Sequence, residues 1–112
     1  MQNLLEETLK FLEENGKSPA DVEWIGSESY GHFDWEHFES VADVEYHAGY
    51  GAQEVACDLV IVGDGWWMER VEYDGAEGWG FKTPPTRPDD VREVKRLVDS
   101  VKGWEGLRDL NG

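Results

Sequence analysis

The sequence predicts an α+β fold in which a small antiparallel sheet of three to four strands packs with an N-terminal helix, a short middle helix and a C-terminal helix. Three observations predict it. Apolar residues recur at helical spacing near both ends of the chain, residues 54–62 form a β-rich apolar run, and Asp-Gly pairs suited to hairpin turns follow that run closely. With 112 residues, 39% of them hydrophobic, the chain is long enough for a single domain, residues 1–112, to bury a core without disulfides.

The first helix is expected to begin near Leu4 and to end at Asn15-Gly16, a pair suited to a C-cap. Its core-facing residues recur at spacings of three and four: Leu4, Leu5, Thr8, Leu9, Phe11 and Leu12. Residues 18–21, SPAD, predict a short helical turn, because Ser18 has an acid three residues later and a proline suits the first helical position. The next run, VEWIG, predicts a short strand.

A short middle helix is predicted over the segment DWEHFESVA, with Asp34 as its N-cap. Four apolar residues fall roughly on one of its faces: Trp35, Phe38, Val41 and Ala42. A brief strand around residues 44–46 and a glycine-containing loop, HAGYGAQ, are expected to follow.

Residues 54–83 are expected to form the meander of the sheet. The segment EVACDLVIV, residues 54–62, is nearly continuously apolar and favours a central strand that is covered on both faces. Cys57 falls in the middle of this segment and is expected to be buried. A second hairpin is predicted to turn at Asp74-Gly75, through a loop of either two or four residues.

The spacing of the first hairpin predicts a cross-strand register. If residues 63–65 form a three-residue loop, Val62 lies opposite Trp66, and Asp58 lies opposite Arg70. Asp58 and Arg70 are therefore predicted to form a structural ion pair.

The tryptophans of this region have two interpretations. Adjacent Trp66 and Trp67 point to opposite faces of a regular strand, so they do not form one stacking platform. Either form of the second hairpin places Trp79 on the Trp66 face, which favours packing in a small core. The alternative is an exposed aromatic surface, for which Trp66 and Trp104 are the candidates.

A C-terminal helix is predicted after the proline-rich segment KTPPTRPDD. The predicted helix ends at Lys102-Gly103. Its apolar residues recur at helical spacing and are Val91, Val94, Leu97, Val98 and Val101. This helix is expected to lie on the sheet. Because the sheet is apolar on both faces, some area is expected to stay open for a partner or a second copy, so both a monomer and a homodimer are consistent with the sequence.

Charge is the strongest global signal in the sequence. The chain has 25 Asp and Glu against 10 Lys and Arg, a net charge of −15, and residues 18–69 hold twelve acids and no Lys or Arg. Such a surface repels nucleic acids and anionic membranes and attracts basic proteins. We therefore expect a basic protein partner, and the candidate contact residues are Glu23, Glu28, Asp34, Glu36, Glu39, Asp43 and Glu45.

No motif for catalysis or for a cofactor is recognisable, so the chain is expected to be neither an enzyme nor a cofactor-binding protein. The single Cys57 indicates a reducing compartment, and the N-terminal segment lacks the pattern of a signal peptide, which together favour the cytoplasm. The segment HFDWEH is the weakest alternative, a metal site formed by His32, Asp34, Glu36 and His37, although the spacing is poor for it.

The run DLVIVGDGWWMERVEYDGAEGWGFKTPP, together with YHAGYGAQEVA, resembles small acidic proteins that are carried by phages and other mobile elements of Gram-positive bacteria. A similar WW-x-ER-x-EYDG-x-E-x-W pattern recurs in them, and the likeness covers about residues 34–85. The resemblance implies a context and no particular activity. In that context, short acidic proteins are often inhibitors of host defence, including anti-CRISPR proteins, some of which resemble DNA in charge.

Two functional hypotheses follow besides the metal site. In the first, the chain is a non-enzymatic acidic module that blocks a basic, nucleic-acid-handling protein, with a nucleic-acid mimic as one form of it. Alternate strand positions lie about 6.6 Å apart, near the spacing of phosphates, so Asp21 with Glu23 and Asp43 with Glu45 are candidate rows. In the second, the chain is a structural or regulatory module that binds through exposed aromatics, and its acids serve solubility.

Overall fold

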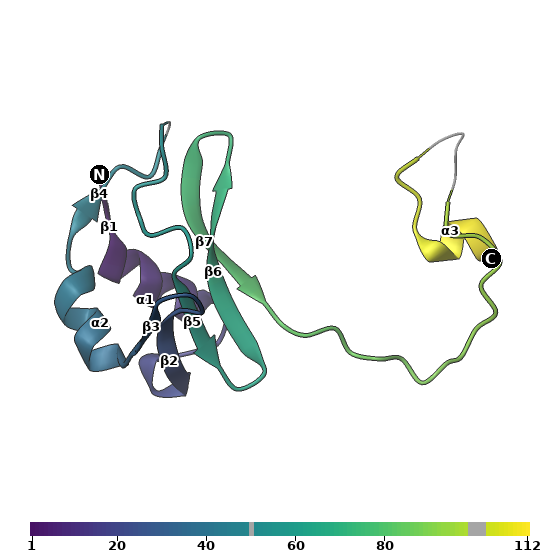
Figure 1. The fold of residues 1–112 in the computed structure, drawn as a ribbon, viewed down its shortest axis with the longest axis horizontal. Coiled ribbons are helices and arrows are strands. Elements are labelled where there is room, and N and C mark those ends of the chain that lie inside the picture. Colours follow the sequence, from purple (N-terminus) through teal and green to yellow (C-terminus); the bar gives the residue numbers. More distant parts are fainter. Residues whose placement is uncertain (50, 99–102) are drawn as a thin grey trace.

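The computed structural model describes residues 1–49, 51–98 and 103–112 and shows a mixed α+β fold (Figure 1). Its main sheet has five antiparallel strands in the order β3-β2-β5-β6-β7. These strands are β2 (Val22–Ser27), β3 (Gly31–Phe33), β5 (Val60–Gly63), β6 (Trp66–Tyr73) and β7 (Ala76–Lys82). The sheet is wider than the predicted three to four strands because the β2–β3 hairpin pairs with β5 and extends the meander.

The predicted N-terminal helix is confirmed as α1 (Leu4–Glu14). The Asn3 side chain caps it by accepting a hydrogen bond from the Glu6 backbone N–H, and Gly16 at φ +72° follows its end. Asn3 also belongs to β1 (Gln2–Asn3), which pairs with β4 (Glu45–Tyr46) in a separate two-stranded sheet. The turn predicted at residues 18–21 is the 3₁₀ helix η1 (Pro19–Asp21).

The middle helix is α2 (Trp35–Ala42), and its cap is the predicted one: Asp34 Oδ1 accepts from the His37 backbone N–H at 2.9 Å. Phe38 and Ala42 are buried on its inner face. Val41 is 57% exposed, so it does not belong to that face as predicted.

The first hairpin differs from its predicted register by one residue. Its loop has two residues, Asp64-Gly65, and Gly63 pairs with Trp66, whereas the prediction placed Val62 there. The contact explains the register, because a Cβ at Gly63 would lie 2.2 Å from the Trp66 indole. Gly63 therefore leaves the space that the ring fills.

Residues 54–59 do not form the first half of a long strand, since only Val60–Gly63 is strand in that region. The predicted central place in the sheet is confirmed for β5, which lies between β2 and β6. Cys57 lies in a turn before β5 and is exposed, so the prediction that it is buried was wrong.

The second hairpin has the shorter of the two predicted loops. Tyr73 pairs with Ala76 around Asp74-Gly75, where φ is +52° and +86°, the conformation of a two-residue type I′ turn. Trp79 lies opposite Arg70, and the Phe81 ring stacks on Trp66 with 5.6 Å between centroids.

The helices cover one face of the main sheet. α1 and α2 lie on the same side of the β6–β7 hairpin (Figure 1), and the buried core joins their apolar residues to those of the strands: Leu4, Leu12, Ile25, Phe38, Ile61, Trp66, Met68 and Trp79. Residues at the alternate strand positions, such as Trp24, Val62 and Trp67, face the other way. No described residue beyond β7 except Leu110 is buried.

The helix predicted over the apolar residues Val91, Val94, Leu97 and Val98 is absent from the structure. Residues 83–98 have no regular secondary structure and run away from the sheet (Figure 1), and Val101 lies outside the described residues. The only helix described there is α3 (Leu107–Asn111). Prolines in the segment 83–88 favour an extended chain, and a helix gains most of its stability from a packed apolar face, which this segment lacks.

Candidate protein-binding surface

The seven predicted contact acids are all exposed, and we call them the acidic surface: Glu23, Glu28, Asp34, Glu36, Glu39, Asp43 and Glu45. They come from β2, the β2–β3 turn, α2 with both its ends, and β4. α2 and β4 lie at the side of the molecule away from the C-terminal segment (Figure 1). The acidic surface is therefore built from consecutive elements of the chain, from β2 to β4.

Three of these acids also have a structural role. Asp34 caps α2, Glu39 Oε2 accepts from Trp35 Nε1 at 3.3 Å, and Asp43 Oδ1 accepts from Asn3 Nδ2 at 2.9 Å. Within the described part of the chain, no hydrogen bond or ion pair involves the side chains of the other four, Glu23, Glu28, Glu36 and Glu45. Their carboxylates remain available to a partner.

Arg70 is the only Lys or Arg between residues 18 and 81, and its side chain is 0% exposed. Its Nη2 donates to Glu77 Oε2 and to the Tyr46 hydroxyl, both at 3.0 Å. Its Nη1 lies 3.6 Å from Glu7 Oε2, and the guanidinium lies 4.7 Å from the centroid of the Trp79 ring. The one cation of this stretch thus has its partners inside the protein, although its buried Nε and Nη1 make no hydrogen bond.

Tyr46 connects this buried arginine to α1. Its hydroxyl donates to Glu7 Oε1 while it accepts from Arg70 Nη2. Burial, and then the hydrogen bond to Glu7, raises the pKa of Tyr46 to about 12, because both disfavour the phenolate. Glu77, the nearest carboxylate to Arg70, also accepts the Glu54 backbone N–H at 2.6 Å and so holds the loop before β5.

The predicted ion pair of Asp58 with Arg70 is wrong. Asp58 lies in the turn before β5, where Oδ2 accepts from Ser29 Oγ at 3.4 Å. The two-residue loop and the short β5 remove the strand position that the prediction assigned to Asp58. The true partner, Glu77, lies opposite Glu72 on β7, and a two-residue turn at Asp74-Gly75 would have placed it on the Arg70 face.

The two aromatic surface candidates differ. Trp66 is 4% exposed and belongs to the core, so it cannot form an exposed surface. Trp104 is fully exposed and lies in the C-terminal segment, before α3.

The structure does not bring together the four residues of the metal hypothesis. His32 contacts Trp24, with 6.5 Å between ring centroids, while His37 contacts Phe33 at 5.5 Å and Asp34 caps α2. Among residues 1–49, 51–98 and 103–112, no three His, Cys, Asp or Glu side chains group closely enough to hold a metal ion.

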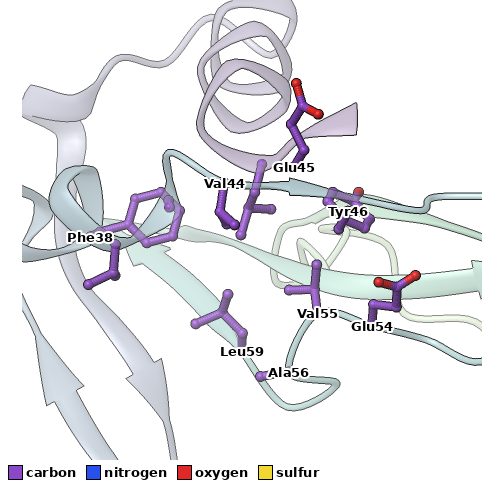
Figure 2. Close-up of a pocket in the computed structure, with 11 residues that line it drawn as sticks. Phe38, Val44, Glu45, Tyr46, Glu54, Val55, Ala56 and Leu59 are labelled. Atoms are coloured by element: carbon purple, nitrogen blue, oxygen red, sulfur yellow. The ribbon is translucent and has the colours of Figure 1, made fainter. Parts of the chain in front are cut away.

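An apolar hollow of about 370 Å³ lies next to the acidic surface. Figure 2 shows Phe38, Val44 and Tyr46 on one side of it and Val55 and Leu59 on the other. The first three come from α2, its end and β4, and the last two from the loop before β5. The hollow is large enough to accept an apolar side chain of a partner.

The fold and this surface define a small α+β domain with an acidic side. The chain has no match among protein-family models, curated proteins or solved structures. In the part of the chain that the structure describes, no helix has the length and apolar character needed to cross a membrane.

Proposed function

We propose that the chain is a non-enzymatic protein-binding module whose acidic surface binds a basic protein. The observation that supports this most is the burial of Arg70. Because that side chain is fully buried, the stretch from residue 18 to residue 81 exposes no Lys or Arg, while all seven acids of the acidic surface are exposed. A surface of one sign attracts an oppositely charged partner from a distance and accelerates association.

The hollow beside Glu45 supplies the apolar contact that charge alone does not. Stable interfaces combine a small apolar centre with a polar rim. An apolar side chain of the partner enters between Phe38 and Leu59, and its neighbouring Lys or Arg residues face the acidic surface. The partner is therefore a protein with a basic, partly apolar binding region.

The finer form of the proposal is an inhibitor of a nucleic-acid-handling protein, in keeping with the resemblance to acidic proteins of phages. Such a partner has a basic surface that the acids of this chain would occupy in place of phosphates. The mimicry does not use the expected strand rows, because Asp21 lies in η1 and Asp43 follows the end of α2. It rests on the charge of the whole surface.

The test is capture of partners from a bacterial lysate by tagged protein, with elution by stepwise salt. A basic nucleic-acid-binding protein is expected to elute only at raised salt and to stay bound after nuclease treatment. The matched test variant changes Glu23, Glu28, Glu36 and Glu45 to Gln, because these four make no described internal bond. It is expected to weaken binding of the captured protein about tenfold or more, roughly 0.4 kcal/mol or more for each charge removed.

The control variant removes the same charge elsewhere, through Glu13→Gln, Glu14→Gln, Asp64→Asn and Asp74→Asn. It is expected to bind nearly as well as the parent chain. Equal losses in the two variants would show that net charge, and not the acidic surface, determines binding. Retention that ignores both salt and the test variant would refute the proposal.

A further inference from the structure

One face of the main sheet has no cover in the described structure. Trp24, Val62 and Trp67 are successive cross-strand partners on β2, β5 and β6, and they alternate with the buried residues of the other face. Val71, farther along β6, is 40% exposed. We call Trp24, Val60, Val62, Trp67 and Val71 the open face, the apolar side chains on a side of the sheet that also carries the Glu69–Lys82 ion pair.

The C-terminal segment, for its part, has apolar side chains that are exposed. Val91 is 98% exposed, Leu97 74% and Val98 76%, although their spacing is that of one face of a helix. We call residues 86–98 the arm. Residues 83–85 join the arm to Lys82, the cross-strand partner of Trp67, so the chain leaves the sheet from the row that carries the open face.

The charge of the arm also permits this contact. Residues 1–82 hold nineteen Asp and Glu against four Lys and Arg, whereas residues 83–112 hold six of each. The arm itself is close to neutral, with four bases against three acids: Arg87, Arg92, Lys95 and Arg96 against Asp89, Asp90 and Glu93. It is therefore the part of this chain that can lie against so acidic a domain without repulsion.

We infer that the open face binds the arm of a second copy of this chain, so that two copies exchange arms in a symmetric dimer. On the open face the arm forms a helix and turns Val91, Val94, Leu97 and Val98 to the sheet. Exchange of this kind lets each copy cover the face that its own extended arm leaves bare.

The occupant is a second copy because of how the arm departs. Pro84, Pro85 and Pro88 favour an extended and semi-rigid segment between β7 and the apolar stripe. The structure shows the arm running away from its own sheet (Figure 1), and none of its side chains joins the core. A stiff linker that points outward delivers the stripe to a neighbour more readily than to its own domain.

The first measurement is the mass of the full chain in solution by light scattering across a wide range of concentrations. We expect twice the chain mass of 12.8 kDa. Because the contact is apolar and joins two acidic domains, added salt is expected to strengthen it. A particle that stays monomeric at every concentration would overturn the inference.

Charged substitutions then locate the contact. Val71→Asp on the open face and Leu97→Asp on the arm are each expected to raise the dimer dissociation constant about tenfold or more. The control is Val41→Asp, which alters a valine on α2 that is 57% exposed and is expected to leave the dimer intact. A dimer that survives both Val71→Asp and Leu97→Asp would show that another surface makes it.

Cross-linking distinguishes a second copy from the chain's own arm, and it needs no variant that threatens the fold. In a Cys57→Ser background, chains with Val71→Cys are mixed with chains with Leu97→Cys and treated with a bifunctional maleimide. A cross-linked pair that contains one chain of each kind is expected. If instead a chain with both cysteines only cross-links within itself when dilute, the arm covers its own sheet and the inference is wrong.

Discussion

Arg70 connects three parts of the fold that lie far apart in the sequence. Its guanidinium joins Glu77 on β7, Tyr46 on β4 and Glu7 on α1. Replacing it with Met leaves the Glu77 carboxylate buried without its cation. We expect Arg70→Met to lower the free energy of unfolding by about 3–5 kcal/mol, measured by urea denaturation with tryptophan fluorescence.

Asp58 provides the matched comparison, because the sequence predicts it as the partner of Arg70. It is exposed, and its hydrogen bond to Ser29 is 3.4 Å long. Asp58→Asn is therefore expected to change stability by less than about 0.5 kcal/mol. A loss as large as that of Arg70→Met would restore the pair that the sequence predicts.

Tyr46 makes the stability of this network depend on alkaline pH. Its pKa is raised from the usual 10.0 to about 12 in the folded chain, so the unfolded chain loses the phenol proton first as pH rises. The stabilisation by this group is complete below pH 10 and is lost between pH 10 and about 12. In urea unfolding across this window, Tyr46→Phe should be less stable at neutral pH and should lose stability less steeply; parallel slopes would contradict the assignment.

At the scale of elements, the sequence predicts most helices and turns because their signals are local. Asp34 at the start of α2, Ser18 before η1 and the two Asp-Gly turns all act within a few residues. The register of β5 and β6 was missed because loops of two and three residues suit the same Gly-Asp-Gly stretch. What decides between them is the indole of Trp66 lying against Gly63, a contact that composition does not reveal.

That contact predicts a strong effect of one added methyl group. Gly63→Ala would place its Cβ 2.2 Å from the Trp66 ring, so the ring or the hairpin must move. We expect a loss of about 1–3 kcal/mol, measured as a lower midpoint of thermal or urea unfolding. Gly49→Ala is the control, since no heavy atom lies within 4 Å of its new Cβ; similar losses in both variants would remove the role of the indole.

The apolar residues of the arm show the other limit of local signals. Their spacing predicts a helix, but a helix of this length needs a surface to pack on. Whether that surface belongs to the same chain or, as proposed above, to a second copy is beyond what periodicity can predict. The same applies to the acidic surface: acids are expected at the exterior, whereas the hidden position of Arg70 follows from long-range packing.

For the whole molecule, two associations are proposed, and salt separates them. Binding of a basic protein to the acidic surface weakens as salt rises, because it depends on opposite charges. Exchange of arms between two acidic domains strengthens, because salt screens their repulsion. Apart from β2, which carries both Glu23 and Trp24, the acidic surface and the open face lie on different elements, so a variant such as Val71→Asp or Glu36→Gln is expected to disrupt one and spare the other.

The exposed position of Cys57 has a practical consequence. It is the only thiol in the chain, and its neighbour Ala56 lines the hollow of Figure 2. A fluorophore attached to this thiol labels each molecule once, beside the hollow that we propose receives an apolar side chain of the partner. Its emission would follow a partner's arrival at the hollow in real time, without any engineered substitution.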